Sequence, residues 1–372
     1  MEQQVVKQVI RQPIEQQPIE RQIEKHLKAT VTPIASQLDS ESSLLFSAFE
    51  ALGQKGWLAP KLANDYGALA LSNQKYQQFQ SLIAQHSGAL AFLQTQHQSA
   101  ASLLASSENE PLKQTYLPKM VTGAQKVGVG FSQLRRRPVP LKAEKTATGY
   151  RIDGIVPWVT GAGLFTHFIS AATLPDGRAV FGLLPLKDQQ SSLCNSLCKL
   201  TVGRPMSLAG MSATNTVEVR LDNWQLAQDQ VVAIKPTGWI EGRDRANPLS
   251  PIGLIFGCTQ AAINELQVAL AKRKIDHPAS QQLALKLAWL RMDAKRVIAL
   301  PEDAYMQKMA LRGKAIALMN TCAEAAVVAA SGAANTTHHP AQRIYKEALV
   351  FSVSGQTTQG AIATLNALIP NA

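Results

Sequence analysis

Arg135, Arg136 and Arg137 follow one another directly and form a compact block of positive charge. A guanidinium group pairs with phosphate or carboxylate through a planar fork of N–H donors. The block could therefore bind the phosphate of a ligand. The alternative interpretation is a basic turn that water solvates.

Two other spacings also occur in functional sites. The chain has four cysteines: Cys194, Cys198, Cys258 and Cys322. The first two have a spacing found in metal sites, but no second ligand pair accompanies them, so we expect structural or inert thiols. The Gly-x-Gly at Gly128 and Gly130 precedes no predicted helix, so a dinucleotide-binding loop is not expected.

Composition limits the classes of protein to consider. Of the 372 residues, 46% are hydrophobic and 17% are charged, which predicts a chain with a substantial core. The formal net charge of +11 favours an anionic small ligand over nucleic acid, because the cations are scattered and not interleaved with aromatics. We expect no membrane span, no secretory leader and a cytoplasmic location.

Hydrophobic periodicity divides the chain into three blocks, which we predict to be domains at residues 1–124, 125–233 and 234–372. Helical patterns fill the first block, including an arm over residues 1–36 that is broken at Pro13 and Pro18, then residues 42–57, 73–86 and 89–106. Four helical patterns return in the third block, at residues 252–274, 280–299, 302–330 and from 341 onward.

The middle block is predicted to be an antiparallel β unit. Residues 168–173 and 179–184 flank a Pro175-Asp-Gly177 turn and predict a hairpin. A further turn is expected at Gly154, and residues 216–221 alternate as a half-buried strand should. The fold class is thus α+β, with helices, then an antiparallel β-barrel, then a four-helix bundle.

Five segments in this order resemble the acyl-CoA dehydrogenase superfamily along nearly the whole chain. They are Pro60 to Gly67, Tyr116 to Gly123, Trp158 to Gly161, Gly210 to Val219, and Pro340 to Ala348. Each match is short. Their order and spacing, together with the α–β–α plan, carry the resemblance.

The resemblance implies a flavin site. The family's tryptophan packs on the flavin ring and its threonine bonds the N5 edge; these positions are Trp158 and Thr160 here. An indole offers a large stacking face, and a hydroxyl can donate or accept. Ser132, directly after Phe131, falls where the family bonds the pyrimidine end of the ring.

The phosphate end of this implied site departs from the family. The serine that helps to hold the pyrophosphate is missing, and Arg135, Arg136 and Arg137 occupy that region. They could replace the lost contact, or bind a phosphate of coenzyme A or of an acyl carrier protein. FAD is the expected cofactor. Two loops of the helical bundle depart from the family as well, so FMN or no cofactor stays open.

The family's catalytic base is also missing. The usual glutamate position corresponds to Gly355, and the alternative position used by some members corresponds to Asn247. Neither residue can remove a proton from carbon. Three acids could substitute: Glu241, Asp244 and Glu347. For His338 and His339, a solvated loop is expected.

Three functions therefore stay open. The first is an FAD-dependent oxidoreductase that acts on the CH–CH bond of an acyl thioester with a non-standard base. The second is a flavin monooxygenase of the same fold, which takes reduced flavin from a partner reductase and needs no such base. The third is a catalytically silent protein that binds flavin or an acyl carrier. A homodimer or homotetramer is expected, and an electron acceptor is a possible partner.

Overall fold

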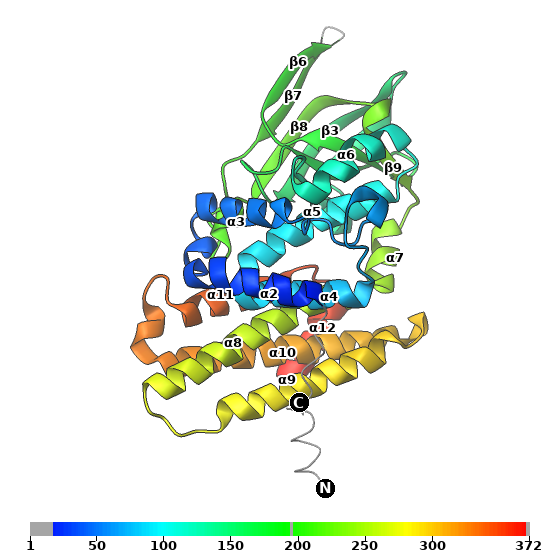
Figure 1. Cartoon of the computed structure of the whole chain (residues 1–372). Coiled ribbons are helices and arrows are strands. Elements are labelled where there is room, and N and C mark those ends of the chain that lie inside the picture. The colour runs from blue at the N-terminus through cyan, green and yellow to red at the C-terminus, as the bar shows by residue number, and fades with distance from the viewer. Residues whose placement is uncertain (1–17, 194–195, 370–372) are drawn as a thin grey trace. The chain divides into compact units, whose positions relative to one another are not determined.

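The computed structural model describes residues 18–193 and 196–369, and the α–β–α order is confirmed (Figure 1). Pro13 of the predicted arm and Cys194 lie outside the described residues. The N-terminal helices are α2 (Pro18–Thr30), α3 (Ser42–Gln54), α4 (Asn73–His86), α5 (Gly88–Ala105) and α6 (Glu110–Thr122). They match the predicted helical block, to which α6 adds a helix that had not been resolved from the pattern.

The middle of the chain forms one nine-stranded sheet in the order β6-β7-β8-β3-β2-β4-β5-β9, and β1 pairs with β4. The strands are β1 (Val127–Gly130), β2 (Leu141–Lys145), β3 (Gly149–Val159), β4 (His167–Thr173), β5 (Ala179–Pro185), β6 (Gln189–Leu193), β7 (Ser196–Val202), β8 (Val217–Ala227) and β9 (Val231–Lys235). The predicted hairpin is confirmed as β4 paired with β5. Two pairs, β1–β4 and β2–β4, are parallel, so the sheet is not antiparallel throughout.

The turn expected at Gly154 is absent, and β3 runs through this residue without interruption. Gly154 has a φ of +126° and coincides with a shift of register against β8. A Cβ at this position would lie 2.0 Å from the carbonyl oxygen of Pro140. The glycine therefore marks a β-bulge and a close backbone approach, two uses that share the sequence signature of a turn.

The C-terminal block is helical, as predicted. Its helices are α7 (Trp239–Ala246), α8 (Ile252–Lys272), α9 (Ala279–Ile298), α10 (Tyr305–Ala330), α11 (Pro340–Val353) and α12 (Thr358–Leu368). The last predicted helix is interrupted at residues 354–357, and this loop contains Gly355. Glycines let these helices approach closely: a Cβ on Gly257 would lie 2.4 Å from the carbonyl oxygen of Ser81, and one on Gly313 would lie 2.2 Å from that of Ala363.

Backbone proximity groups the chain into two compact units. One contains the segments up to Gln37, Gln77–Gly88 and from Asn247 onward; the other contains Leu38–Tyr76 and Ala89–Ala246. The three-domain division drawn from the sequence is finer than this grouping and stays a prediction. Each unit is described below by itself.

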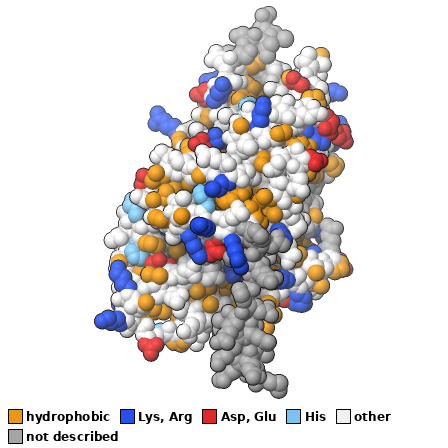
Figure 2. Space-filling model, viewed as in Figure 1, with side chains coloured by type: hydrophobic (Ala, Val, Ile, Leu, Met, Phe, Trp, Pro, Cys, Tyr) orange, Lys and Arg blue, Asp and Glu red, His pale blue; other side chains and the backbone are white. Residues whose placement is uncertain are grey.

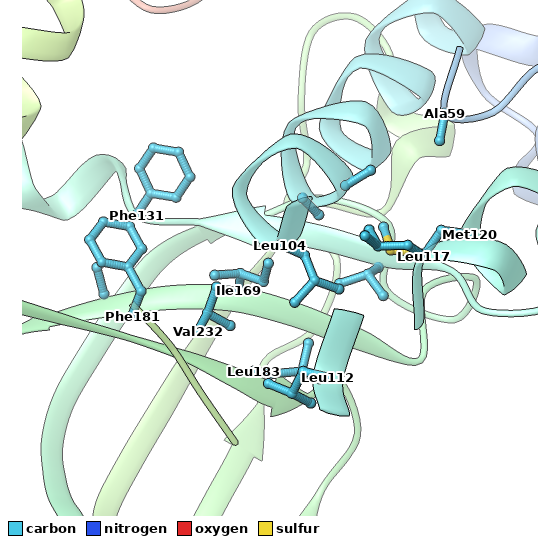
Figure 3. Packing of buried hydrophobic residues seen from close by; sticks show 14 of the residues in the cluster. Ala59, Leu104, Leu112, Leu117, Met120, Phe131, Ile169, Phe181, Leu183 and Val232 are labelled. Carbon is cyan, nitrogen blue, oxygen red and sulfur yellow. The ribbon is translucent and has the colours of Figure 1, made fainter. Parts of the chain in front are cut away.

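The core of the second unit lies between helices and the sheet. Side chains of α5 and α6 point toward β4, β5 and β9, as Figure 3 shows for Leu104, Leu117, Ile169, Leu183 and Val232. All five are at most 3% exposed. This packing fixes β1 and the residues that follow it.

Two helices, Ile252–Lys272 and Tyr305–Asn335, are long and apolar enough to cross a membrane by length and composition, so the expected absence of a membrane span stays a prediction. Of their most apolar stretches, 61% and 44% are buried inside the structure, as is also typical of helices in a buried bundle.

Basic side chains are spread over the face seen in Figure 2, with hydrophobic side chains between them.

Candidate functional site

Trp158 lies at the end of β3, where a bulge exposes it. Val156 pairs with Val219 and Val159 pairs with Val217, so β3 contains one more residue than β8 across this interval. The bulge leaves both valines of β3 fully buried, while Trp158 is 45% exposed. A large flat indole face is therefore available to a ligand.

Strand β1 runs beside this end of β3 and brings Phe131 and Ser132 close to it. A Cβ on Gly130 would lie 3.3 Å from the carbonyl oxygen of Trp158, and one on Gly128 would lie 3.3 Å from that of Thr160. The Gly-x-Gly thus allows two strands to approach each other. The structure brings together the two segments that sequence comparison had placed at opposite ends of a flavin ring.

Ser132 has a hydroxyl that lacks a partner. It begins the short 3-10 helix η4 (Ser132–Arg135), and its Oγ is buried with no hydrogen-bond partner among the described residues. A buried polar group left unpaired costs about 1–3 kcal/mol. A ligand that supplies the missing partner would recover this cost, so the residues present fit a polar ligand at this corner.

Phe131, the residue before Ser132, is buried and packs against other aromatic rings. Its ring lies 5.9 Å from that of Phe181 and 6.1 Å from that of Trp239. These are aromatic packing distances, so Phe131 is a core residue that fixes the position of Ser132. Its predicted role in cofactor binding is not tested by this contact.

Thr160 is buried and belongs to a group of three threonines. Its Oγ1 lies 3.1 Å from Oγ1 of Thr216, which lies 3.3 Å from Oγ1 of Thr214 at the end of η5 (Ser212–Thr214). Sequence reasoning missed Thr214 and Thr216. The alternation in β8 would have placed Thr216 on the exposed face with Glu218 and Arg220.

Side chains from the N-terminal helical segment hold η5 in place. A carboxylate oxygen of Asp39 accepts a hydrogen bond of 2.7 Å from the backbone N–H of Met211. The Ser42 hydroxyl donates to the Asn215 side-chain carbonyl at 2.9 Å. Met211 and Asn215 both adopt left-handed backbone conformations, so these contacts stabilise a strained turn.

The arginine block is largely paired with acids of α7. Arg135 binds Asp244 through two hydrogen bonds of 2.6 and 2.7 Å, and Arg137 lies 2.5 Å from Glu241. Arg136 is exposed and, in the described part of the chain, has no acidic partner. Two of the three guanidinium groups are thus paired with acids, and binding of a cofactor by this block stays a prediction. Their carboxylate partners had been proposed only as candidate bases.

One further cation, which sequence reasoning missed, lies near Phe131, and a second, Lys61, lies over the Tyr76 ring. The Arg243 guanidinium lies 5.4 Å from the Phe131 ring centre and 5.9 Å from that of Trp239. Burial lowers the pKa of Arg243, and burial together with the charge of Arg243 lowers the pKa of Lys61. Positive charge held among aromatic rings suits an anionic organic ligand.

The first unit contains both positions where a base had been sought. Gly355 adopts a φ of +60°, and a Cβ there would meet no heavy atom within 4 Å. The buried guanidinium of Arg312 donates to the backbone carbonyls of Ser354 and Gly355 at 3.0 and 3.1 Å. It also reaches the carbonyl of Pro248, the residue after Asn247, at 3.4 Å. One arginine thus ties the two positions together.

The remaining candidates have structural contacts. Glu347 is fully buried, accepts from Arg343 at 2.8 and 2.9 Å, and accepts from the Gly88 backbone N–H at 2.8 Å. His339 accepts from the Ala341 backbone N–H and caps α11, and His338 precedes it with a φ of +67°. Over residues 18–193 and 196–369, no group of three or more His, Cys, Asp or Glu side chains could hold a metal ion.

Comparison with known proteins gives three results. The family model described as "Acyl-CoA dehydrogenase, N-terminal domain" matches residues 13–124. The very long-chain specific acyl-CoA dehydrogenase of Rattus norvegicus is 24% identical over 227 residues, which cover 55% of this chain and 34% of that protein. The short/branched chain specific acyl-CoA dehydrogenase of Bos taurus is 22% identical over 220 residues, which cover 56% of this chain and 48% of that protein. The chain therefore spans between a third and a half of the length of these curated relatives.

Solved structures match over a larger share of the chain. A glutaryl-coenzyme A dehydrogenase in complex with glutaryl-CoA has a TM-score of 0.77 at 17% identity, with 93% of this chain and 92% of that chain covered. FkbI, described as acting in biosynthesis of a methoxymalonyl extender unit, has a TM-score of 0.75 at 17% identity, with 92% and 97% covered. At these identities the matches show the fold.

Proposed function

Because the chain belongs to the acyl-CoA dehydrogenase superfamily, we propose that it is a flavoprotein that binds FAD where β1 and β3 end. We further propose that it acts as an oxidoreductase on the CH–CH bond of an acyl thioester. When bound, the flavin would supply the acceptor for a hydride. The chain's own residues would hold the ring, orient it and exclude water.

The observation that carries this proposal is the unpartnered hydroxyl of Ser132 two residues after Gly130, which packs against the backbone of Trp158, whose indole is exposed. A flat ring stacked on the indole would need a polar partner at its edge. Ser132 and Thr160 each provide a hydroxyl close to this end of β3. A purely structural tryptophan would not explain why a buried hydroxyl next to its strand has no partner.

The phosphate contacts of the cofactor are proposed to involve Arg136. It is the exposed arginine of the block, while Arg135 and Arg137 are held by Asp244 and Glu241. A single guanidinium fork can still pair with a phosphate. FAD and FMN both carry phosphate and both suit this contact, so the proposal of FAD rests on the resemblance to acyl-CoA dehydrogenases.

A second function, a monooxygenase of this fold that uses reduced flavin, is favoured by one specific observation. Gly355 and Asn247 supply no base, and the acids Glu241, Asp244 and Glu347 are each paired with an arginine. A carboxylate bound by an arginine is a weaker base because the positive charge stabilises its ionised form. Oxygenation with reduced flavin from a partner reductase needs no base of this kind.

The visible spectrum of the purified protein, before and after addition of FAD, tests the proposal. We expect a yellow protein whose flavin bleaches when an acyl-CoA is added under argon. Flavin that bleaches only with a reductase and is then reoxidised by oxygen would favour the second function. A protein that stays colourless after FAD is added would overturn both and leave a silent binding protein.

A further inference from the structure

The hydroxyl of Thr160 begins a chain of hydrogen bonds that ends at a backbone carbonyl. Thr160 and Thr216 are linked at 3.1 Å, Thr216 and Thr214 at 3.3 Å, and Oγ1 of Thr214 lies 2.8 Å from the carbonyl oxygen of Met211. The three threonines are 6%, 4% and 1% exposed, so water does not compete for these bonds.

The carbonyl at the end of the chain fixes the direction of every bond in it. A carbonyl oxygen only accepts, so Thr214 gives its single hydroxyl hydrogen to Met211. Thr216 then donates to Thr214, and Thr160 donates to Thr216, because each hydroxyl has one hydrogen. What Thr160 has left to offer a ligand is a lone pair.

We propose that this chain makes Thr160 a hydrogen-bond acceptor toward the bound ring, so that the site binds reduced flavin more tightly than oxidised flavin. The inference rests on the proposed function, which places the N5 edge of a flavin at Thr160. N5 of oxidised flavin has a lone pair and no hydrogen, whereas N5 of two-electron-reduced flavin carries a hydrogen. An acceptor at this edge therefore bonds the reduced form and opposes the oxidised form.

Thr216 and Thr214 are positioning residues in this arrangement, since they act through Thr160. Replacing Thr216 by valine keeps the shape of the side chain and removes the acceptor for Thr160. The hydrogen of Thr160 is then free to point at the ring and to donate to oxidised N5. Thr214→Val has the same consequence, because Thr216 loses its acceptor and can donate to Thr160 instead.

The test measures equilibrium dissociation constants for oxidised FAD and for dithionite-reduced FAD under argon, by titration of the full chain. For the unmodified protein we expect reduced FAD to bind about tenfold more tightly, which corresponds to roughly one net hydrogen bond. Thr216→Val should lower this ratio about tenfold. Thr216→Ser, which keeps the hydroxyl, should retain it, and so should Thr321→Val, whose hydroxyl donates to the carbonyl of Ala317 in its own helix.

The outcomes separate the inference from the function on which it rests. Equal affinities in the unmodified protein, or a ratio that Thr216→Val leaves unchanged, would overturn the inference while FAD binding stands. No binding of either form would overturn the proposed function as well. Thermal unfolding of each variant checks that it folds, and Thr214→Val replaces Thr216→Val if the latter does not.

Discussion

On the proposed function, the Ser132 hydroxyl contributes to ligand binding and not to the stability of the fold. Its hydroxyl is buried and has no partner in the part of the chain that is described. We therefore expect Ser132→Ala to leave the thermal unfolding temperature unchanged or slightly raised, because an unpaired buried polar group is removed. The same substitution should weaken FAD binding about tenfold, since it removes the hydrogen bond of the bound state.

Calorimetric unfolding and an FAD titration on the same preparation check this prediction. Ser47→Ala is a suitable control, because the Ser47 hydroxyl bonds the carbonyl of Ser43 in its own helix. Loss of stability without loss of FAD affinity at Ser132 would show a structural role.

Gly355 has no side chain at the position where the resemblance implies a catalytic glutamate. Space is open around its Cβ position, so a longer side chain fits there, although the positive φ costs about 1 kcal/mol. On the proposed function, which gives Gly355 the family's base position, Gly355→Glu should speed flavin reduction by an acyl-CoA by about 100-fold or more, the usual contribution of a positioned base. Anaerobic stopped-flow absorbance measures the rate. Gly355→Gln is the matched control and should give no gain.

His97 makes stability depend on pH. Burial lowers its pKa to about 4, from an ordinary value of 6.5. The unfolded chain therefore binds a proton that the folded chain does not bind between these two values. The contribution of His97 to the free energy of unfolding should therefore be fully present above pH 6.5. It should be lost as pH drops toward 4, which lowers the free energy of unfolding by up to about 3 kcal/mol.

Chemical denaturation across pH 4–7.5 checks this expectation. Burial also lowers the pKa of His86 to about 4, so His97→Gln should flatten part of the pH dependence and His86→Gln another part. Ser47→Ala, which removes no ionisable group, is the control and should leave the curve unchanged. A pH dependence that survives both core substitutions would contradict the prediction.

At the scale of elements, α11 is held by a buried ion pair. Arg343 and Glu347 are 7% and 0% exposed, and the carboxylate also accepts from the backbone N–H of Gly88. Arg343→Met should lower the free energy of unfolding by about 3–5 kcal/mol, because it leaves a buried charge without compensation. Arg296→Met, which breaks the exposed pair with Asp293, should cost less than about 1 kcal/mol.

Urea unfolding of the two variants measures the difference. Equal losses would mean that the buried pair contributes no more than an exposed one. The same measurement on Glu347→Gln should give a smaller loss than Arg343→Met, because a neutral amide can still accept from Gly88.

At the scale of the whole molecule, α11 presents an apolar stripe to solvent. Tyr345, Leu349 and Val353 recur every four residues and are 51%, 50% and 60% exposed. Exposed apolar stripes on a helix indicate association, which supports the predicted homo-oligomer. We expect light scattering to give a mass that is a multiple of 40.2 kDa, and Leu349→Glu to reduce it.

Leu349→Met keeps the stripe apolar and should keep the assembly. Comparison with Leu349→Glu therefore distinguishes the effect of a buried charge from the effect of replacing leucine. A single-chain mass for the unmodified protein would contradict the prediction. If Leu349→Glu dissociates the assembly, FAD titration of this variant shows whether assembly and cofactor affinity are linked.

The sequence by itself determined the order of helices and strands and the β4–β5 hairpin, because periodicity and residue type are local properties. Its resemblance to a family predicted the missing base and the site residues Trp158, Thr160 and Ser132. Only the tertiary structure decided that Arg135 and Arg137 are occupied, that Gly154 is a bulge, and that Thr160 leads to Thr216 and Thr214. These facts depend on residues distant in sequence, whose approach is set by packing and by strand register and leaves no local pattern.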